Sequence, residues 1–443
     1  MKHIVTISLL LTVAMASAGV ADSAGELSFG GDLRFRQTTF DHVPLRHGGT
    51  LDWSFLRTRP RLWAQYQITD NTLVRARFTN EFRKWYRPAA RDQYEFPSET
   101  MVDNLYLDIR GMAGGSLDLR IGRQDLIYGT GKIILDGTPG DGSRTIYFDA
   151  VKATWKGFSN MTLDLLGLYC FAENPLLING EDINLTNLTG QDVNMEADEL
   201  GVGVYLRHEG LKGNWPFEAY YLFKQEAEFT LVGGDKHPSV EYSTLGVRIM
   251  PRFSERLTGN LEMAYQLGSS GDRDLSGYML DAKVNMELGA VGRLQPRLSA
   301  GLYVLSGNDP ATADDEAWRP PFARWPQNSE LYIYAYAADR SSVADWQNLV
   351  LPYLECSTPL GGKITSTALV GHMSAMEKDG PDPTGRARGL LLTWWNRFNL
   401  AEGLVLERDA ISGHLLLETV RPGSYYTVDD ASTWVRWEFI YSF

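Results

Sequence analysis

The chain ends with the stretch TWVRWEFIYSF, Thr433 to Phe443, which is the most informative part of the sequence. On one face of such a strand every second residue is apolar: Val435, Trp437, Phe439, Tyr441 and Phe443. Arg436 and Glu438 share the other face. One broad apolar face and one charged face suit a strand that stands between lipid and a water-filled lumen. A soluble edge strand of this kind would invite aggregation, so the stretch predicts a membrane-spanning β-barrel.

The beginning of the chain is typical of an exported bacterial protein. Met1 to His3 form a short basic start, residues 4–14 are apolar, and Ala16-Ser17-Ala18 supplies the small residues of a cleavage site. This apolar run is shorter than the roughly 20 residues that a helix needs to cross a bilayer. We therefore expect a signal peptide at residues 1–18 and a single outer-membrane β-barrel domain at residues 19–443.

The composition favours β structure and argues against several classes of function. Aromatic residues make up 12% of the chain and there are 43 glycines, as expected for a barrel with interfacial aromatic girdles. The net charge of −13 argues against a nucleic-acid partner. Cys170 and Cys356 are the two cysteines, and we expect both to be unpaired. The histidines show no metal-binding spacing, so we expect no metal and no other cofactor.

Period-two segments bounded by turn residues predict about eighteen strands in an all-β, antiparallel barrel. They fall near residues 27–37, 55–68, 72–84, 101–110, 116–125, 144–156, 161–172, 197–208, 215–227, 238–250, 256–268, 274–287, 293–306, 346–357, 363–375, 385–398, 411–420 and 431–443. Short connections alternate with long polar ones, except near 269–273 and 376–384, and the longest connection spans about 307–348. Short periplasmic turns opposite long extracellular loops are typical of outer-membrane barrels. A hairpin at 331–337 or the poorly defined connection 398–411 would change the count.

The segment from Leu119 to Val151 reads LRIGRQDLIYGTGKIILDGTPGDGSRTIYFDAV. It resembles the alginate-export family of outer-membrane barrels, in which a strand ending in GRQ leads to a G-x-G-[KR] loop. The next strand of that pattern begins near an Arg and continues Phe-Asp-Ala/Gly-Val. The matching positions here are Gly122-Arg123-Gln124, Gly129 to Lys132, Arg144 and Phe148-Asp149-Ala150-Val151.

Further motifs extend the resemblance over nearly the whole mature chain. Residues 55–61 resemble the second strand of the family, 306–309 the step into its longest loop, and 413–426 the segment before its final strand. Asn308 stands where the family more often has Asp, so substrate identity does not carry over. The terminal Phe443 resembles the signal that outer-membrane barrels present to the barrel insertion machinery. The resemblance therefore implies the bacterial outer membrane, with lipid and lipopolysaccharide as further partners.

Arginines gather on one face of each of the first three predicted strands: Arg34 and Arg36, then Arg57, Arg59 and Arg61, then Arg75, Arg77 and Arg83. Because these strands are neighbours, we expect one patch on the barrel wall. An Arg that faces lipid at the bilayer midplane costs about 2–4 kcal/mol, so these side chains are predicted to face the lumen. Arg436 of the last strand is expected to join them.

Two interpretations of this patch stay open. The arginines could form an electropositive constriction that favours carboxylated solutes, as the family resemblance also implies. They could instead pair with lumenal acids and only hold the barrel in shape, and the candidate partners are Glu81, Asp108, Asp118, Asp149, Glu218 and Glu262. The resemblance makes Arg123, Arg144 and Asp149 the expected anchors of the adjoining loop.

The sequence predicts a passive outer-membrane channel for an anionic polysaccharide or oligosaccharide. In an export channel, periplasmic partners would deliver the polymer; the alternative is an uptake porin for anionic oligosaccharides or small solutes. An enzyme is not expected, because the loop pair Asp235 and His237 has no nucleophile beside it. A non-conducting adhesin would have its lumen plugged by its own loops. The acidic run Asp314-Asp315-Glu316 lacks the ordered ligand spacing of a calcium site.

Overall fold

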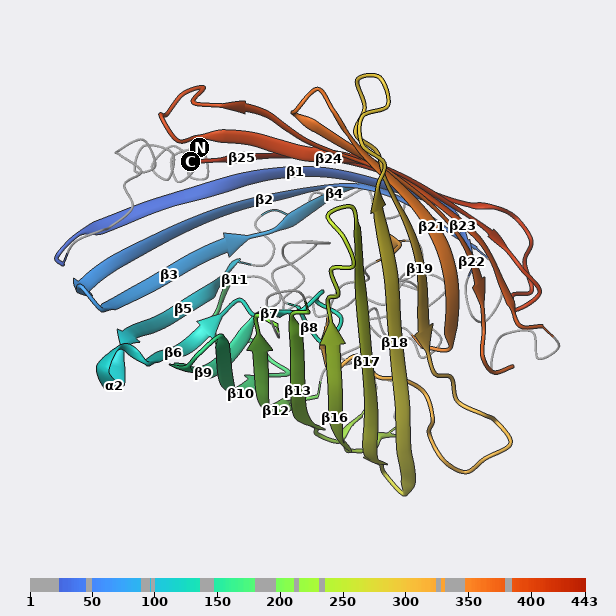
Figure 1. The fold of residues 1–443 in the computed structure, drawn as a ribbon, viewed down its shortest axis with the longest axis horizontal. Helices are drawn as coiled ribbons and strands as arrows, with labels where there is room; N and C mark the ends of the chain where they lie inside the picture. Colours follow the sequence, from blue (N-terminus) through green and yellow to red (C-terminus); the bar gives the residue numbers. More distant parts are fainter. Residues whose placement is uncertain are drawn as a thin grey trace.

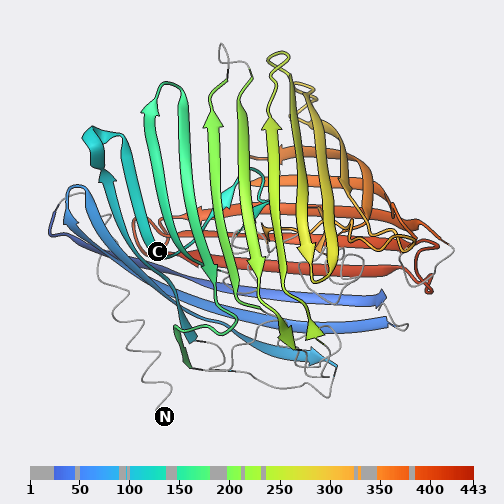
Figure 2. The same ribbon diagram turned by 90° about the horizontal axis from the view of Figure 1, so that it is seen from below.

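The computed structural model describes residues 24–44, 50–88, 96, 100–135, 147–179, 197–210, 215–230, 236–323, 328–330, 347–378 and 385–443. Within these ranges the chain forms a closed antiparallel β-barrel of 18 strands (Figure 1). The first strand pairs with the last, from Asp32 opposite Ser442 to Asp41 opposite Thr433. Figures 1 and 2 both show this seam, where blue β1 runs beside red β25.

The N-terminal half of the barrel consists of β1 (Leu27–Pro44), β2 (Thr50–Thr69), β3 (Thr72–Asn80) continued by β4 (Phe82–Arg87), β5 (Thr100–Gly111), β6 (Leu117–Gln124), β9 (Phe148–Phe158), β10 (Met161–Cys170), β12 (Glu199–His208) and β13 (Phe217–Glu226). The strand β12 shows why such segments are strands. Gly201, Gly203 and Tyr205 are buried, whereas the alternate residues Val202 and Val204 are exposed on the outer face.

The C-terminal half consists of β16 (Val240–Ile249), β17 (Leu257–Ser270), β18 (Arg273–Glu287), β19 (Arg297–Leu305), β21 (Leu349–Leu360), β22 (Ile364–Ser374), β23 (Ala387–Glu402), β24 (Ala410–Pro422) and β25 (Ser432–Ser442). The described connections also contain a single helical turn, α2 (Met112–Gly115), and six short strands. Three of these strands are β11 (Leu177–Asn179), β14 (Phe229–Thr230) and β15 (Lys236–His237), and the other three form the small sheet described below. No helix within the described ranges is long and apolar enough to cross a membrane.

The predicted fold class and strand number are confirmed, but two strand ends were predicted too short. β1 continues beyond residue 37 and β2 begins before residue 55. At this end of the barrel the inward side chains are aromatic, because Phe40 and Trp53 are buried and Phe40 stacks on Trp434 at 4.9 Å between ring centroids. In these parts of β1 and β2 the alternation of polar lumenal and apolar outer side chains is therefore lost, although both strands continue. The predicted third strand is divided at Glu81 into β3 and β4.

Most connections alternate in length as predicted, and the connection between β17 and β18 is a predicted short exception at the opposite end. Asp70 and Asn71 join β2 to β3 at one end of the barrel, and β17 is joined to β18 at the opposite end by Gly271 and Asp272, a tight turn in which Gly271 has a φ of 59°. The connection between β23 and β24 covers residues 403–409. The possible hairpin at 331–337 and the predicted signal peptide lie outside the described residues.

Two long connections fold into the lumen and meet there. β7 (Ile127–Tyr128), β8 (Ile134–Leu135) and β20 (Phe322–Ala323) form a small sheet, here called the inner sheet, in which Phe322 pairs with Ile134 in parallel. Figure 1 shows β7 and β8 inside the ring of strands. Phe322 and the neighbouring Trp318 are fully buried in an apolar cluster with wall residues such as Leu168 and Leu222. The inner sheet therefore packs against one side of the barrel.

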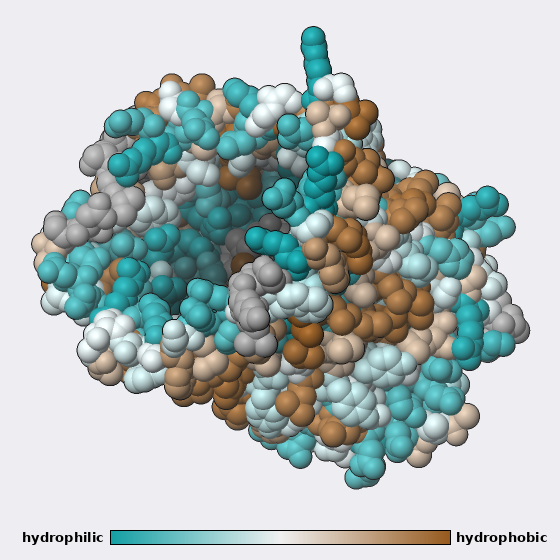
Figure 3. Space-filling model, viewed as in Figure 1, coloured by the Kyte–Doolittle hydropathy of each residue, from teal (hydrophilic) through white to brown (hydrophobic). Residues whose placement is uncertain are grey.

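The outer face of the barrel is apolar, as a lipid contact requires. Leu165, Leu245 and Leu354 are each more than half exposed on the outside of their strands. Figure 3 shows extended hydrophobic areas outside and a hollow lined by hydrophilic side chains. Cys170 and Cys356 do not form a disulfide, as expected from the sequence.

Candidate functional site

The arginines of β1 and β2 lie side by side on the lumenal wall. We call Arg34, Arg36, Arg57, Arg59 and Arg61 the basic wall. The strand register places Arg34 directly opposite Arg59, and Arg36 directly opposite Arg57. Residues directly opposite one another point to the same side of a sheet, so the alternation in each strand brings these arginines onto one face. Like charges in opposite positions are destabilising unless negative groups lie between them.

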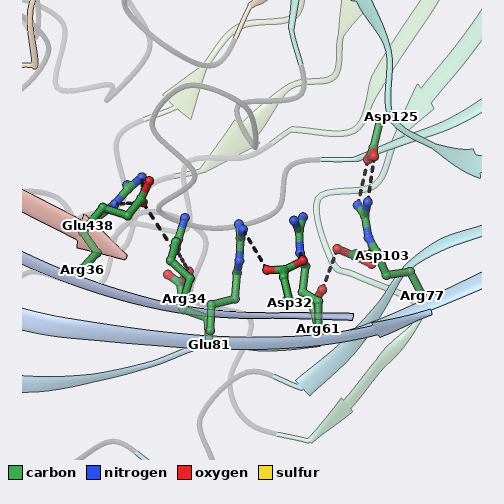
Figure 4. Close-up of polar contacts among 11 residues, drawn as sticks. Asp32, Arg34, Arg36, Arg61, Arg77, Glu81, Asp103, Asp125 and Glu438 are labelled. Carbon is green, nitrogen blue, oxygen red and sulfur yellow. Dashed lines mark hydrogen bonds and ion pairs between the residues drawn. The ribbon is translucent and has the colours of Figure 1, made fainter. Parts of the chain in front are cut away.

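Asp32 is the first carboxylate of the basic wall, and it comes from the same face of β1 as the arginines. Its Oδ2 accepts a hydrogen bond from Nε of Arg61 at 2.7 Å. Its Oδ1 lies 3.6 Å from Nη2 of Arg59, which is an ion contact without a hydrogen bond. Figure 4 shows Asp32 beside Arg61 above the strands β1 and β2. Asp32 thus neutralises one end of the arginine row.

Glu81 and Glu438 are two further described acids among these arginines. Glu81 accepts a hydrogen bond from Nη2 of Arg34 at 2.7 Å and lies 3.7 Å from Nε of Arg57. Glu438 of β25 accepts a hydrogen bond from Nε of Arg36 at 2.7 Å, across the seam. The division of the third strand at Glu81 therefore coincides with a carboxylate held in the arginine row.

Arg77 of β3 belongs to a separate ion-pair cluster. Its Nε donates to Asp103 at 2.8 Å, and its Nη1 and Nη2 each donate to one oxygen of Asp125 at 2.9 Å. Asp103 is in β5 and fully buried, whereas Asp125 begins the connection that forms the inner sheet. Arg77 therefore ties the inner sheet to the barrel wall.

Arg75 and Arg83 contact aromatic rings. The guanidinium of Arg75 lies 4.3 Å from the ring centre of Trp63, and that of Arg83 lies 5.7 Å from the ring centre of Trp85. Both side chains are intermediate in exposure and lie on the lumenal face, because Arg83 is opposite Arg57 and Arg75 is opposite Gln65. The single patch predicted from the sequence is thus divided into a basic wall, an ion-pair cluster and these two ring contacts.

Arg123, in the segment 119–151 that carries the family resemblance, donates several hydrogen bonds. It donates to both oxygens of Asp149, at 3.0 and 2.8 Å, and to Oδ1 of Asn174 and the carbonyl of Val102 at 2.8 and 2.9 Å. These bonds join β5, β6 and β9 to the connection that follows β10. Arg144 lies outside the described residues.

Arg436 and Glu438 of the last strand face inward, whereas Trp437 and Phe439 are exposed outside. Nε of Arg436 donates to Nε2 of His414 at 2.9 Å, and Nη2 lies 2.8 Å from a carboxylate oxygen of Glu330. The two faces predicted for the last strand are therefore present. Glu330 belongs to the longest connection, and its contact with the wall was not predicted.

The opposite side of the lumen arranges its charges differently. We call Arg207, Glu218, Arg248 and Glu262 the mixed wall, because each lies directly opposite the next in the register of β12, β13, β16 and β17. Nη1 of Arg248 donates to Glu218 at 3.0 Å, and the hydroxyl of Tyr220 donates to Glu262 at 3.0 Å. Positive and negative groups alternate along this wall.

The acids predicted as partners of the arginine patch are thus only partly right. Glu81 lies in the basic wall and Asp149 binds Arg123, but the other four pair elsewhere. Asp108 binds Arg110 and Arg120, Asp118 binds Lys156, and Glu218 and Glu262 belong to the mixed wall. Strand spacing shows which face an acid occupies, but it does not show which cation is nearest around the barrel.

The turn Gly129 to Lys132 holds the inner sheet in the lumen. Nζ of Lys132 donates to Asp281 of β18 at 2.9 Å, and the hydroxyl of Thr130 donates to Glu262 at 3.2 Å. The hydroxyl of Tyr128 donates to buried Asp164 at 2.7 Å. Sequence reasoning missed Lys132 as a lumenal contact, although the family-like G-x-G-[KR] segment contains it.

The structure gives the other candidate sites ordinary roles. His237 stacks on Phe229 at 4.7 Å between ring centres, and Asp235 lies outside the described residues. Asp315 pairs with Arg319 at 2.8 Å, and Glu316 accepts a hydrogen bond from Thr312. In the described part of the chain, no group of three or more His, Cys, Asp or Glu side chains is placed to hold a metal ion.

Comparison with known proteins identifies the family. Residues 25–331 match the family described as alginate export. The chain belongs to the alginate export family. The architecture is shared with outer-membrane proteins of Pseudomonas aeruginosa, at identities that show the fold alone. Its OccK3 (OpdO) has a TM-score of 0.53 and 12% identity, with 94% of this chain and 95% of that chain covered.

The outer-membrane protein OpdK of the same organism has a TM-score of 0.55 and 10% identity, covering 94% of this chain and 99% of that one. A structure of OpdK with vanillate has a TM-score of 0.55 and 9% identity, with 94% of this chain and 98% of that chain covered. Among curated proteins, none matches this chain. This alginate export family member is therefore a bacterial outer-membrane barrel of the porin type, and its family and fold are those of channels rather than enzymes.

Proposed function

We propose that the protein is a passive channel for anionic carbohydrate, of the polysaccharide-export type. The basic wall carries this proposal. Among the described residues its five arginines lie with three carboxylates, Asp32, Glu81 and Glu438, so positive groups exceed negative ones by two. A wall that only held the barrel in shape would need no surplus, as the alternating charges of the mixed wall illustrate.

Guanidinium groups suit the passage of carboxylates. Their planar fork matches the two oxygens of a carboxylate, and they stay charged at any working pH. Alternate residues of one strand are about 6.8 Å apart, so Arg57, Arg59 and Arg61 provide successive positive groups along β2. A solute with many carboxylates would move from one to the next without being held tightly, which conduction requires.

The export direction is supported by the family match over residues 25–331. In this function, periplasmic partners would deliver the polymer to the end of the barrel where β1 begins and β25 ends. A second candidate is uptake of small carboxylated solutes. It is favoured by the inner sheet, which occupies part of the lumen, and by the similar fold of OpdK, whose structure was solved with vanillate, a small carboxylate.

Ion selectivity in planar bilayers tests the basic wall. Replacing Arg57, Arg59 and Arg61 together by Gln should lower anion selectivity several-fold, because the lumenal positive charge is removed. A matched variant with Gln at Arg120, Arg207 and Arg248 removes three lumenal arginines that stand beside acids, and it should retain more of the selectivity. If the basic-wall variant is as anion-selective as the wild type, the basic wall is not the filter.

Flux measurements with liposomes distinguish polysaccharide export from uptake of small carboxylates. Vesicles that contain the purified protein should release long polyuronate as well as short oligouronates if the channel serves export. Retention of the long polymer together with free passage of small carboxylates would favour uptake. Release of neutral oligosaccharides of matched length provides the control for lumen size.

A further inference from the structure

Arg59 lies at the centre of the basic wall with only 2% of its surface exposed. Its contact with Asp32 is 3.6 Å long, which is beyond hydrogen-bonding distance. Its Nε and Nη1 atoms are buried and have no hydrogen-bond partner in the described structure. A buried charged donor without an acceptor is costly, so this side chain calls for an explanation.

Three neighbouring arginines also have buried N–H donors without an acceptor. Nε of Arg34, Nε of Arg57 and Nη1 of Arg61 are buried and also lack an acceptor among the described residues. Arg34 lies directly opposite Arg59, and the other two flank Arg59 on the same face of β2. Unsatisfied N–H groups of four guanidinium groups thus belong to one small area of the lumenal wall.

The carboxylates within this area cannot satisfy these donors. Each guanidinium carries five N–H groups, whereas a carboxylate accepts about four hydrogen bonds. Asp32, Glu81 and Glu438 are the described acids in contact with these four arginines. Glu438 lies 3.9 Å from Nε of Arg34, too far for a hydrogen bond, and its own hydrogen bond is to Arg36. Oδ1 of Asp32 is itself without a hydrogen bond. Turning Asp32 toward Arg59 would satisfy one or two donors and leave the others unchanged.

Water alone supplies acceptors but no charge. Among the described residues, five guanidinium groups, Arg36 included, and three carboxylates leave two positive charges in a place with little solvent. Positive groups that stand directly opposite each other there are weakly screened and repel. A negatively charged ligand with two or more oxygens would supply both the missing acceptors and the missing charge, through charge-assisted hydrogen bonds.

We propose that Arg59, together with Arg34, Arg57 and Arg61, forms a discrete oxyanion-binding site in the lumenal wall. The ligand is a carboxylate or a phosphate. It comes either from the transported solute or from the surrounding medium as a small resident anion. The inference deepens the proposed function and rests on it only where the ligand is the carboxylate of a solute. Because the donors are buried, a resident anion would exchange slowly and remain bound through dialysis.

Crystals of the full-length mature protein soaked in sodium selenate test the site directly. Selenate is a tetrahedral oxyanion with a strong anomalous signal. We expect a selenium peak with oxygens within hydrogen-bonding distance of Arg59 and of at least one of its three partners. Only water at this position would overturn the proposal. Ion chromatography of dialysed, acid-denatured protein then shows whether phosphate was already resident, at about one ion per chain.

Calorimetric titration of the detergent-solubilised protein at low salt measures affinity. Inorganic phosphate and glucuronate serve as probes for the medium and the solute. We expect saturable binding that Arg59→Gln weakens about tenfold or more, as the loss of charge-assisted bonds implies. The control Arg207→Gln removes an arginine of the mixed wall and should bind as the wild type does. Equal binding by both variants would overturn the proposal, and the selenate soak requires no variant to fold.

The binding and selectivity experiments together distinguish failure of the oxyanion site from failure of the proposed function. An anion-selective channel with no saturable oxyanion binding would leave the function standing and reject the site. Saturable binding lost in Arg59→Gln, in a channel without anion selectivity, would establish the site and reject the function. Binding of phosphate but not glucuronate would assign the site to a resident anion.

Discussion

The basic wall and the mixed wall obey the same alternation of side chains, yet they order their charges in opposite ways. Across β12 to β17 the register reads Arg207, Glu218, Arg248, Glu262, so unlike charges face each other at every step. Across β4, β2 and β1 it reads Arg83, Arg57, Arg36, so like charges face each other before Glu438 is reached. Alternation of sign stabilises a wall, whereas repetition of sign destabilises it. The difference supports the proposal that the mixed wall stabilises the barrel and the basic wall binds the solute.

The largest effect on stability is expected where the inner sheet joins the side of the mixed wall. Asp281→Ala leaves the buried ammonium of Lys132 without its carboxylate, and such losses reduce the free energy of unfolding by about 3 kcal/mol. Urea unfolding followed by tryptophan fluorescence measures this change. The double variant Lys132→Met, Asp281→Ala should recover most of the loss. A double variant no more stable than the single one would show that the ion pair is not the cause.

A much smaller change in the free energy of unfolding is expected from a substitution in the basic wall. Arg57→Gln removes one of two arginines that face each other, while Glu81 keeps its 2.7 Å contact with Arg34. Relief of repulsion offsets the lost ion contact, so the free energy of unfolding should change by less than about 1 kcal/mol. The same urea titration in phosphate-free buffer checks this prediction. A loss as large as that of Asp281→Ala would remove the contrast between the two walls.

A pH-dependent effect is expected outside the two walls. Asp409, in the turn between β23 and β24, accepts backbone hydrogen bonds from Leu404, Val405 and Leu406 and one from the hydroxyl of Tyr441. Desolvation raises the pKa of Asp409, but these hydrogen bonds outweigh it and lower the pKa to about 2.

Since the pKa of Asp409 is lower in the folded than in the unfolded chain, its contribution to stability is present above about pH 4 and is lost as the pH falls toward 2. Wild type and Asp409→Asn should therefore differ in unfolding midpoint at pH 7 and converge at the acidic end. A constant difference across this range would mean that ionisation of Asp409 is not responsible.

The sequence predicted the barrel because its signal is local. Period-two alternation needs only neighbours along one strand, and Trp437 and Phe439 outside with Arg436 and Glu438 inside show that it was sufficient. The inward direction of Arg34 and Arg59 followed from the same pattern. Asp32 lies on the same face of its strand as Arg34 and Arg36, but it was not among the predicted partners of the arginines.

The partners of these side chains were not predictable, because they depend on contacts between distant segments. Arg77 binds Asp125 only because the connection after β6 folds into the lumen. The inner sheet consists of two-residue strands, which are too short to show any periodicity, and Phe322 pairs with Ile134 from a different connection. The outer ends of β1 and β2 were missed for another reason, namely the aromatic lining at Phe40 and Trp53.

The seam between β1 and β25 has a consequence for how the barrel is made. Arg36 and Glu438 are 402 positions apart in the chain, yet they share a hydrogen bond across this seam. Because β1 is synthesised before β25, its arginines are present before the carboxylate of Glu438 is available. A chain cut short of Glu438 would keep the repulsion between Arg36 and Arg57 and lose the group that offsets it. Charge neutralisation across the seam thus favours closure of chains that carry Glu438 over chains that lack it.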